Sequence, residues 1–198
     1  MKEIWKVLLH LTGGIYVPNE LKDKSVKVMH ISDTPSMIYK DLIQLIKTVK
    51  PHVLIHTGDI ADEVKLEMLP YHVQKYKARA NHFLRAISPF VEDRIIVTLG
   101  NHDCMEALHP LPKLEVYEES TVLGVYGIRI SISHYYEKLH ENSEFYMYGH
   151  CRVNTKDPSY LDGIDSINII KVENKEIIKL LYPAGTDNYR LRRSKMGI

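Results

Sequence analysis

Three short apolar segments in the first half of the chain each end directly in polar residues, and helical segments separate them. The three segments cover residues 26–31, 53–57 and 95–99. Between them, residues 37–49 and 71–87 carry apolar side chains at helical spacing, with Ser36 as the expected cap of the first helix and Pro51 as its stop. Strand, helix, strand, helix, strand is the order of parallel βαβ units, so this half predicts an α/β fold.

The second half of the chain has a different pattern. Short strands with short connections are expected at residues 121–125, 128–133, 145–148, 167–172 and 177–181. Residues 125–127 and 173–175 are typical of tight hairpin turns. A parallel half followed by a hairpin-rich half predicts two packed sheets with helices outside. No repeat or long linker interrupts the pattern, so we expect residues 1–198 to form a single domain.

Charge and composition exclude several function classes. The net charge is +1, which gives no overall field for nucleic acid or an anionic membrane, and no apolar run approaches the roughly 20 residues needed to span a bilayer. Two cysteines, Cys104 and Cys151, are too few for a disulfide framework or a four-cysteine zinc site. The apolar stretch in residues 1–11 contains charged residues and lacks a cleavage site. We therefore expect a cytoplasmic protein with no membrane partner.

The C-terminal tail is basic, with Arg190, Arg192, Arg193 and Lys195 close together. Such runs are typical of solvated or frayed ends, and we expect that here. The tail could instead approach a phosphodiester, so nucleic acid is expected only as a substrate. At the other end, residues 2–21 have no derivable role beyond an added edge strand or helix.

Potential ligands follow each of five predicted strands. They are Asp33; Asp59; Asn101, His102 and Asp103; His134; and His150. In open α/β sheets, ligands bind beyond the carboxyl ends of the strands. Gly58, Gly100 and Gly149 precede Asp59, Asn101 and His150, and glycine allows the sharp turns that a convergent site requires.

Carboxylate, amide oxygen and imidazole form a mixed oxygen and nitrogen ligand set. This set suits Mn, Fe, Zn, Co or Ni better than Ca, and without thiolates it is not a structural zinc site. An aspartate after one strand is more often a cap or turn residue, and a lone histidine such as His134 is more often structural. Five such positions at five strand ends instead favour a site for one or two divalent metal ions.

The motifs around these residues resemble those of the calcineurin-like metallophosphoesterases. The family pattern is Asp-x-His, Gly-Asp-x-x-Asp, Gly-Asn-His-Asp/Glu, a His usually followed by Gly, and Gly-His-x-His. This chain has residues 32–35 (Ser-Asp-Thr-Pro), 58–62 (Gly-Asp-Ile-Ala-Asp), 100–103 (Gly-Asn-His-Asp), 133–135 (Ser-His-Tyr) and 149–152 (Gly-His-Cys-Arg) in that order. The resemblance implies a four-layer αββα sandwich of two mixed β-sheets flanked by helices, which agrees with the two-sheet prediction.

The resemblance also implies roles for the metal ligands. Asp59 would bridge two ions, and Asn101, His134 and His150 would complete one subsite. The other, which we call the first subsite, would use Asp33 and two histidines, but those two positions hold Pro35 and Arg152. Proline offers no ligand atom and guanidinium is a permanent cation, so the first subsite lacks both histidines.

By the same resemblance, His102 would protonate the leaving oxygen or stabilise transition-state charge, and Asp103 would orient it. We expect a phosphoesterase that runs on one tightly held metal, with Arg152 holding the phosphate of a phosphate-ester substrate. The alternative is a degenerate phosphoesterase fold that binds a protein partner. The sequence leaves phosphomonoester, cyclic nucleotide and nucleic-acid diester open as substrates.

Other residues near the motifs have plainer expectations. His30 and His56 lie three residues before key aspartates, on the opposite face of their strands, and are predicted to be core residues. Tyr135 stands where the family usually has glycine and would make the pocket wall bulkier. Cys151 is expected in the wall. Ser36, Tyr39 and Asp62 lie near the expected mouth, but the sequence singles out none of them as a replacement ligand.

Overall fold

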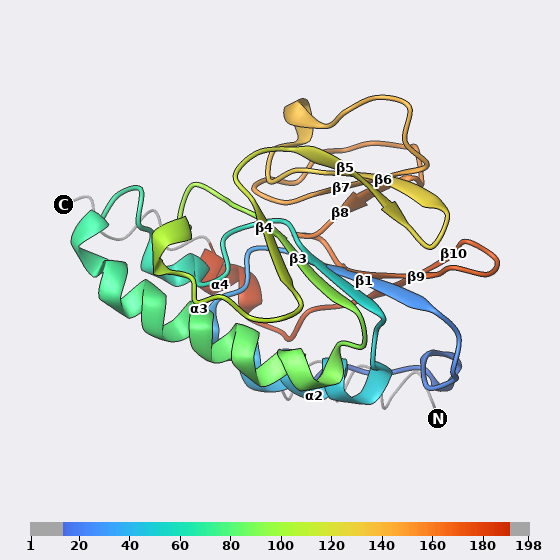
Figure 1. The fold of residues 1–198 in the computed structure, drawn as a ribbon, viewed down its shortest axis with the longest axis horizontal. Coiled ribbons are helices and arrows are strands. Elements are labelled where there is room, and N and C mark those ends of the chain that lie inside the picture. The colour runs from blue at the N-terminus through green and yellow to red at the C-terminus, as the bar shows by residue number, and fades with distance from the viewer. Residues whose placement is uncertain (1–13, 191–198) are drawn as a thin grey trace.

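Two β-sheets packed face to face form the centre of the molecule, as Figure 1 shows in a computed structural model that describes residues 14–190. The larger sheet has six strands in the order β10-β9-β1-β2-β3-β4, and the smaller has four in the order β5-β6-β7-β8. One apolar core lies between the larger sheet and its helices, and a second lies between the two sheets. The predicted α/β class and pair of sheets are confirmed.

The larger sheet contains the parallel half of the chain. Its parallel strands are β1 (Lys27–Ile31), β2 (Val53–His56), β3 (Arg94–Thr98) and β4 (Leu114–Tyr117). The hairpin of β9 (Ile167–Lys171) and β10 (Glu176–Leu180) adds antiparallel to β1, so the sheet is mixed. The first three strands match their predictions to within one residue at each end. β4 was not predicted because its side chains are only partly buried and include a glutamate.

The smaller sheet contains the remaining strands. They are β5 (Thr121–Val125), β6 (Ile128–Ile132), β7 (Phe145–Tyr148) and β8 (Tyr160–Asp162). β5 pairs antiparallel with β6, while β6, β7 and β8 run parallel, so this sheet is also mixed. The turn of the first hairpin uses left-handed Tyr126 (φ 47°) and Gly127 (φ 81°), as the predicted tight turn requires.

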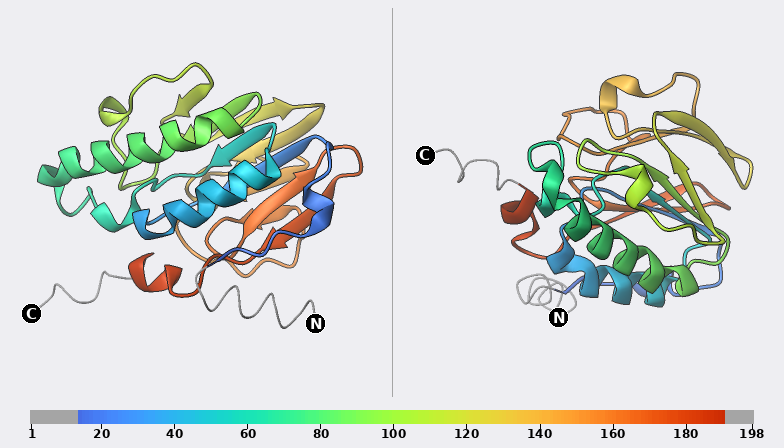
Figure 2. Two further views of the ribbon diagram at one scale, coloured as in Figure 1. Left: turned by 90° about the horizontal axis from the view of Figure 1, so that it is seen from below. Right: turned by 60° about the vertical axis from the view of Figure 1, so that its left-hand side comes forward.

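Two long helices cover the outer face of the larger sheet (Figure 2). They are α2 (Tyr39–Val49) and α3 (Val73–Ile87), each preceded by a 3₁₀ turn, at Ser36–Ile38 and Pro70–His72. The Ser36 hydroxyl bonds to the Glu63 carboxylate and does not cap α2, so its predicted capping role was wrong. A short helix, α4 (Thr186–Arg190), ends the described chain.

The outer side of the smaller sheet has less helix than the αββα pattern implies. Within residues 14–190 it carries loops and the 3₁₀ turn Tyr136–Lys138 (Figure 1). The predicted extra element at residues 2–21 lies partly outside the described residues, which begin with extended chain and the 3₁₀ turn Asn19–Leu21. Among the described helices, none is both long and apolar enough to cross a membrane.

Candidate metal centre

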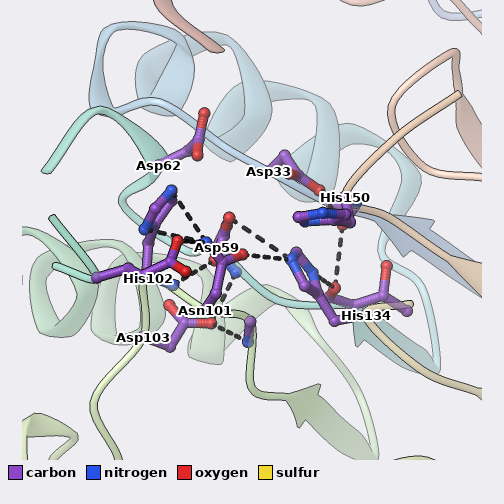
Figure 3. A network of polar contacts seen from close by, with 12 residues as sticks. Asp33, Asp59, Asp62, Asn101, His102, Asp103, His134 and His150 are labelled. Carbon is purple, nitrogen blue, oxygen red and sulfur yellow. Dashed lines mark hydrogen bonds and ion pairs between the residues drawn. The ribbon is translucent and has the colours of Figure 1, made fainter. Parts of the chain in front are cut away.

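The carboxyl ends of five strands bring the predicted ligands together (Figure 3). β1, β2 and β3 are adjacent and parallel, so Asp33, Asp59 and Asn101 emerge at one edge of the larger sheet. β6 and β7 are also parallel neighbours, and they place His134 and His150 at the facing edge of the smaller sheet. Convergence at strand ends is therefore a direct consequence of the topology.

Left-handed backbone turns aim these side chains into one space. Asp33, Asp59 and His150 have φ values of 48°, 58° and 65°. This conformation costs a non-glycine residue about 1–3 kcal/mol, so the surrounding contacts must hold it in place. The Asp33 amide donates to the Gly58 carbonyl at 3.0 Å, which ties the β1 turn to the β2 turn.

Gly58 leaves no room for a side chain. It has a φ of +95°, and a Cβ at this position would lie 2.6 Å from His134 Nδ1 and 2.6 Å from the Gly100 amide nitrogen. A Cβ on Gly100 would in turn lie 2.8 Å from the Asp59 amide nitrogen. The two glycines therefore permit the close approach of the β2 turn to the β3 turn.

Asp59 lies at the middle of the cluster and is only 2% exposed. Its Oδ1 accepts a hydrogen bond from the His102 amide at 2.9 Å, while its Oδ2 lies 3.6 Å from His134 Nε2. Burial raises the Asp59 pKa well above its ordinary value, and the negative charges of Asp33, Asp103 and Asp62 raise it further. A cation beside this carboxylate would offset both effects.

The tautomer of neutral His134 follows from its hydrogen bonds. Nδ1 lies 2.7 Å from the Thr57 carbonyl oxygen, which can only accept, so Nδ1 carries the hydrogen. Nε2 of the neutral ring is then a bare acceptor that faces Asp59. A backbone carbonyl behind the ring is the usual device that orients a metal-binding histidine.

The orientation of the Asn101 amide is set in the same way. Its Nδ2 donates to the Glu67 carboxylate at 2.6 Å, so its Oδ1 must be the atom that lies 3.2 Å from His134 Nε2. His134 Nε2 therefore lies 3.2 Å from Asn101 Oδ1 and 3.6 Å from Asp59 Oδ2, so a nitrogen and two oxygens that can serve as ligand atoms converge. This donor set fits a divalent metal ion.

Asp33 lies close enough to contribute to the same centre. One ligand atom each from Asp33, Asp59 and His134 lie within 4.8 Å of one another, and all three residues are buried. His150 lies at the rim, with its ring centroid 5.1 Å from that of His134, and its side chain is exposed. Its amide donates to Asp33 Oδ2 at 3.1 Å. The five predicted ligands thus lie at one end of the sheets, with Asp33, Asp59 and His134 buried, Asn101 partly buried and His150 exposed at the rim.

Asp103 has contacts that differ from the predicted role. Its carboxylate accepts hydrogen bonds from the amides of Asp59 at 2.6 Å, Ile60 at 2.9 Å and Gly100 at 2.9 Å. Among the described residues, no hydrogen bond joins it to the His102 ring. In this structure Asp103 therefore fixes the β2 and β3 turns, and its role in orienting the His102 ring stays a prediction.

His102 lies on the other side of Asp59 from His134 (Figure 3). It is 3% exposed, and burial is the main cause that lowers its pKa to about 4, with the Lys65 ammonium lowering it further. Its ring nitrogen lies within 4.8 Å of carboxylate oxygens of both Asp59 and Asp62. The uncharged imidazole faces the cavity described next.

A cavity of about 330 Å³ opens above these residues. Its lining includes the cationic side chains of Lys65, Arg152 and Arg190, besides ligands of the metal centre. Cys151 also lines it, as predicted for a wall residue. A larger open depression of about 950 Å³ lies between α2 and α3 and is lined by none of the predicted site residues.

The two residues that replace histidines in the first subsite, Pro35 and Arg152, offer no atom that could bind a metal. Pro35 is buried, and Arg152 is half-exposed and pairs with Asp187 at 2.6 Å and with Asp165 at 3.7 Å. The Arg152 guanidinium is therefore at the cavity wall but already engaged by carboxylates.

Arg190 corrects the prediction that the basic tail is a solvated end. It is only 8% exposed, and its guanidinium donates to the carbonyl oxygens of Asp33 at 2.8 Å, Ser32 at 3.1 Å and Ile164 at 2.7 Å. It also stacks over the Tyr182 ring at 4.3 Å. Arg190 thus fastens α4 to the β1 turn. Arg192, Arg193 and Lys195 lie outside the described residues.

Sequence comparison assigns the family. The profile of the calcineurin-like phosphoesterases matches residues 26–190, which include every predicted site residue. The chain belongs to the calcineurin-like phosphoesterase family. No curated protein matches this chain.

Two solved structures are similar to this chain at low identity. One is YfcE, described as a phosphoesterase from E. coli, with 15% identity, a TM-score of 0.48, and coverage of 80% of this chain and 100% of that chain. The other is a protein of unknown function from Aquifex aeolicus, with 17% identity, a TM-score of 0.44, and coverage of 78% of this chain and 95% of that chain.

Some residues of the site could not be predicted from the sequence. Glu67, Lys65 and Arg190 lie outside the motifs, and only the tertiary contacts reveal their roles. Asp62, the last residue of Gly-Asp-x-x-Asp, lines the cavity although nothing in the sequence singles it out as a ligand. By contrast, His30 and His56 are buried core residues as predicted: they bond to Thr57 and Thr34 at 2.9 Å each.

Proposed function

We propose that the protein hydrolyses phosphate esters with one tightly held divalent metal ion bound by Asp33, Asp59, Asn101 and His134, with His150 at the rim. The observation that carries this proposal is the convergence of His134 Nε2, Asn101 Oδ1 and Asp59 Oδ2. The Thr57 carbonyl orients the His134 ring from behind, and the Glu67 carboxylate orients the Asn101 amide. The bound ion would be Mn, Fe, Zn, Co or Ni, and it would lower the pKa of water and polarise the phosphoryl oxygens.

The protein residues around this centre would bind and orient the ester. The cavity of about 330 Å³ has room for a phosphoryl group with a small substituent. Arg152 would hold the phosphate, sharing its guanidinium with Asp187 or releasing that carboxylate. His102 would donate its ring N–H to the leaving oxygen. Its lowered pKa keeps the imidazole neutral, and the neutral ring can donate one N–H hydrogen bond. The negative charge of a bound substrate would raise this pKa and favour the protonated ring.

The test is hydrolysis of a chromogenic phosphodiester and a chromogenic phosphomonoester with added Mn²⁺, together with elemental analysis of protein purified without chelator. We expect about one metal ion per chain and turnover. Asp59→Asn should remove both the metal and the turnover, whereas His102→Ala should keep the metal and lose at least about 100-fold in kcat. Asp93→Asn, at the opposite end of β3, is the matched control.

The alternative function is protein binding by a phosphoesterase fold without activity. The observation that favours it is that the Arg152 guanidinium already pairs with Asp165 and Asp187, so it is not free to bind a phosphate in the cavity. No metal and no turnover in excess Mn²⁺ would establish this alternative. Turnover that appears only in Pro35→His combined with Arg152→His would establish it too.

A further inference from the structure

Asp59 belongs to a second group of potential ligands besides the one used above. Oxygens of Asp59 and Asp62 and a ring nitrogen of His102 lie within 4.8 Å of one another. The three residues are 2%, 1% and 3% exposed. Ligands of one tetrahedral or octahedral ion lie about 3–4 Å apart, so small side-chain rotations would bring these atoms to coordinating distance. In Figure 3, Asp62 and His102 lie on one side of Asp59, and His134 lies on the other.

Asp62 supplies an independent reason to expect a ligand. Its Oδ2 is buried and has no hydrogen-bond partner, while its Oδ1 pairs with Lys65. The side chain also lines the cavity. A buried acceptor with no partner loses its hydration without replacement, and more so when the group is charged, so the arrangement is unfavourable unless something binds there.

The first subsite offers no competing position for a second ion. Pro35 has no ligand atom, and the Arg152 guanidinium is a cation held by Asp187 at 2.6 Å. Asp33 has its Oδ2 bonded to the Ser32 hydroxyl at 2.6 Å and to the His150 amide. A second cation would therefore find its free ligand atoms on the Asp62 side of Asp59.

We propose that Asp59, Asp62 and His102 form a second, weaker divalent-cation site that replaces the first subsite on the opposite side of the bridging carboxylate. The inference rests on the proposed function in one respect, namely that Asp59 already binds the first ion. The Lys65 ammonium on Asp62 opposes the second cation, which makes this site the weaker one. A filled second site would occupy one ring nitrogen of His102 and leave only the other for a hydrogen bond to the leaving oxygen.

The experiment is titration of metal-free full-length protein with Mn²⁺, with free Mn²⁺ measured by electron paramagnetic resonance and binding measured by calorimetry. We expect two sites in the wild type. Asp62→Asn should lose the weaker site and keep the affinity of the stronger site within about threefold. Lys65→Met should tighten the weaker site about tenfold or more, because it removes a neighbouring positive charge. Asp93→Asn should leave both sites unchanged.

Two results would overturn the inference: a wild type that binds one ion only, or an Asp62→Asn protein that still binds two. If Asp62→Asn fails to fold, as seen by circular dichroism, Lys65→Met decides, and unchanged weak-site affinity in that variant rejects the site. Failure of the proposed function looks different, because it is the absence of any bound ion and of turnover. One bound ion with turnover leaves that function standing and removes only the second site.

Discussion

The Asn101 amide nitrogen donates to the Glu67 carboxylate at 2.6 Å, and this contact turns the amide oxygen toward His134. The orientation of a predicted metal ligand thus depends on an exposed glutamate from the loop between β2 and α3. Loss of the partner behind a metal ligand typically costs about 10- to 100-fold in metal affinity.

Removal of this partner should weaken metal binding. We expect Glu67→Ala to lower the affinity for Mn²⁺ about 10-fold or more, because the Asn101 amide is then free to turn its nitrogen toward the metal. The free energy of unfolding should change by less than about 0.5 kcal/mol, since Glu67 is exposed. Calorimetric titration measures the affinity. Glu67→Gln keeps an acceptor oxygen and should bind more tightly than Glu67→Ala; equal affinity of wild type and Glu67→Ala would contradict the role.

Arg190 should contribute strongly to folding stability. Arg190→Ala leaves the carbonyl oxygens of Ser32, Asp33 and Ile164 without this donor, and we expect the free energy of unfolding to fall by about 3 kcal/mol. Urea denaturation measures it. Arg152→Ala is the matched control: that side chain is 51% exposed, so its loss should cost less than about 1 kcal/mol. Similar losses in the two variants would argue against the fastening role of Arg190.

Gly58 should tolerate no side chain. Gly58→Ala combines a left-handed φ of +95° with a Cβ 2.6 Å from His134 Nδ1, so we expect a loss of at least about 3 kcal/mol and weaker metal binding. Gly127→Ala separates these effects, because its φ is +81° but no atom lies within 4 Å of the added Cβ. It should cost about 1 kcal/mol with metal affinity unchanged. Thermal and urea unfolding give the comparison, and equal costs would show that crowding plays no part.

The buried histidines should make the fold less stable in mild acid. Burial lowers the pKa of both His30 and His56 to about 3, against 6.5 for a free imidazole. Below pH 6.5 the unfolded chain binds protons that the folded chain does not, so stability is present above that pH and is lost as pH falls toward 3. Each histidine should cost about 2 kcal/mol between pH 7.5 and pH 5.

The measurement is urea unfolding at these two pH values for wild type and for His30→Asn. The variant should lose about 2 kcal/mol less than wild type over the interval, whatever its stability at pH 7.5. His140→Asn removes an exposed histidine from the smaller-sheet side and should keep the full wild-type pH dependence. A His30→Asn protein with the wild-type pH dependence would mean that His30 is not held neutral by burial.

The strands and their terminal ligands could be predicted from sequence because both signals are local. A buried parallel strand is a short apolar run, and the turn that follows it carries glycine and polar residues, as at Gly58 and Asp59. Once three such strands lie in parallel, their ligands must meet at one edge. β4 and β8 escaped prediction because each is short and mixes apolar with polar side chains, so the sheet neighbours decide their structure.

The sequence by itself determined that Asp33, Asp59, Asn101, His134 and His150 would meet, because strand order and strand ends place them without reference to side-chain detail. Only the tertiary structure decided which atoms face inward. The Thr57 carbonyl sets the His134 tautomer, and backbone amides donate hydrogen bonds to the Asp103 carboxylate. Arg190 donates to the Asp33 carbonyl in the β1 turn, 157 residues away along the chain. Hydrogen-bond partners between distant segments depend on packing distances of a few tenths of an ångström, and no local pattern of residues encodes those distances.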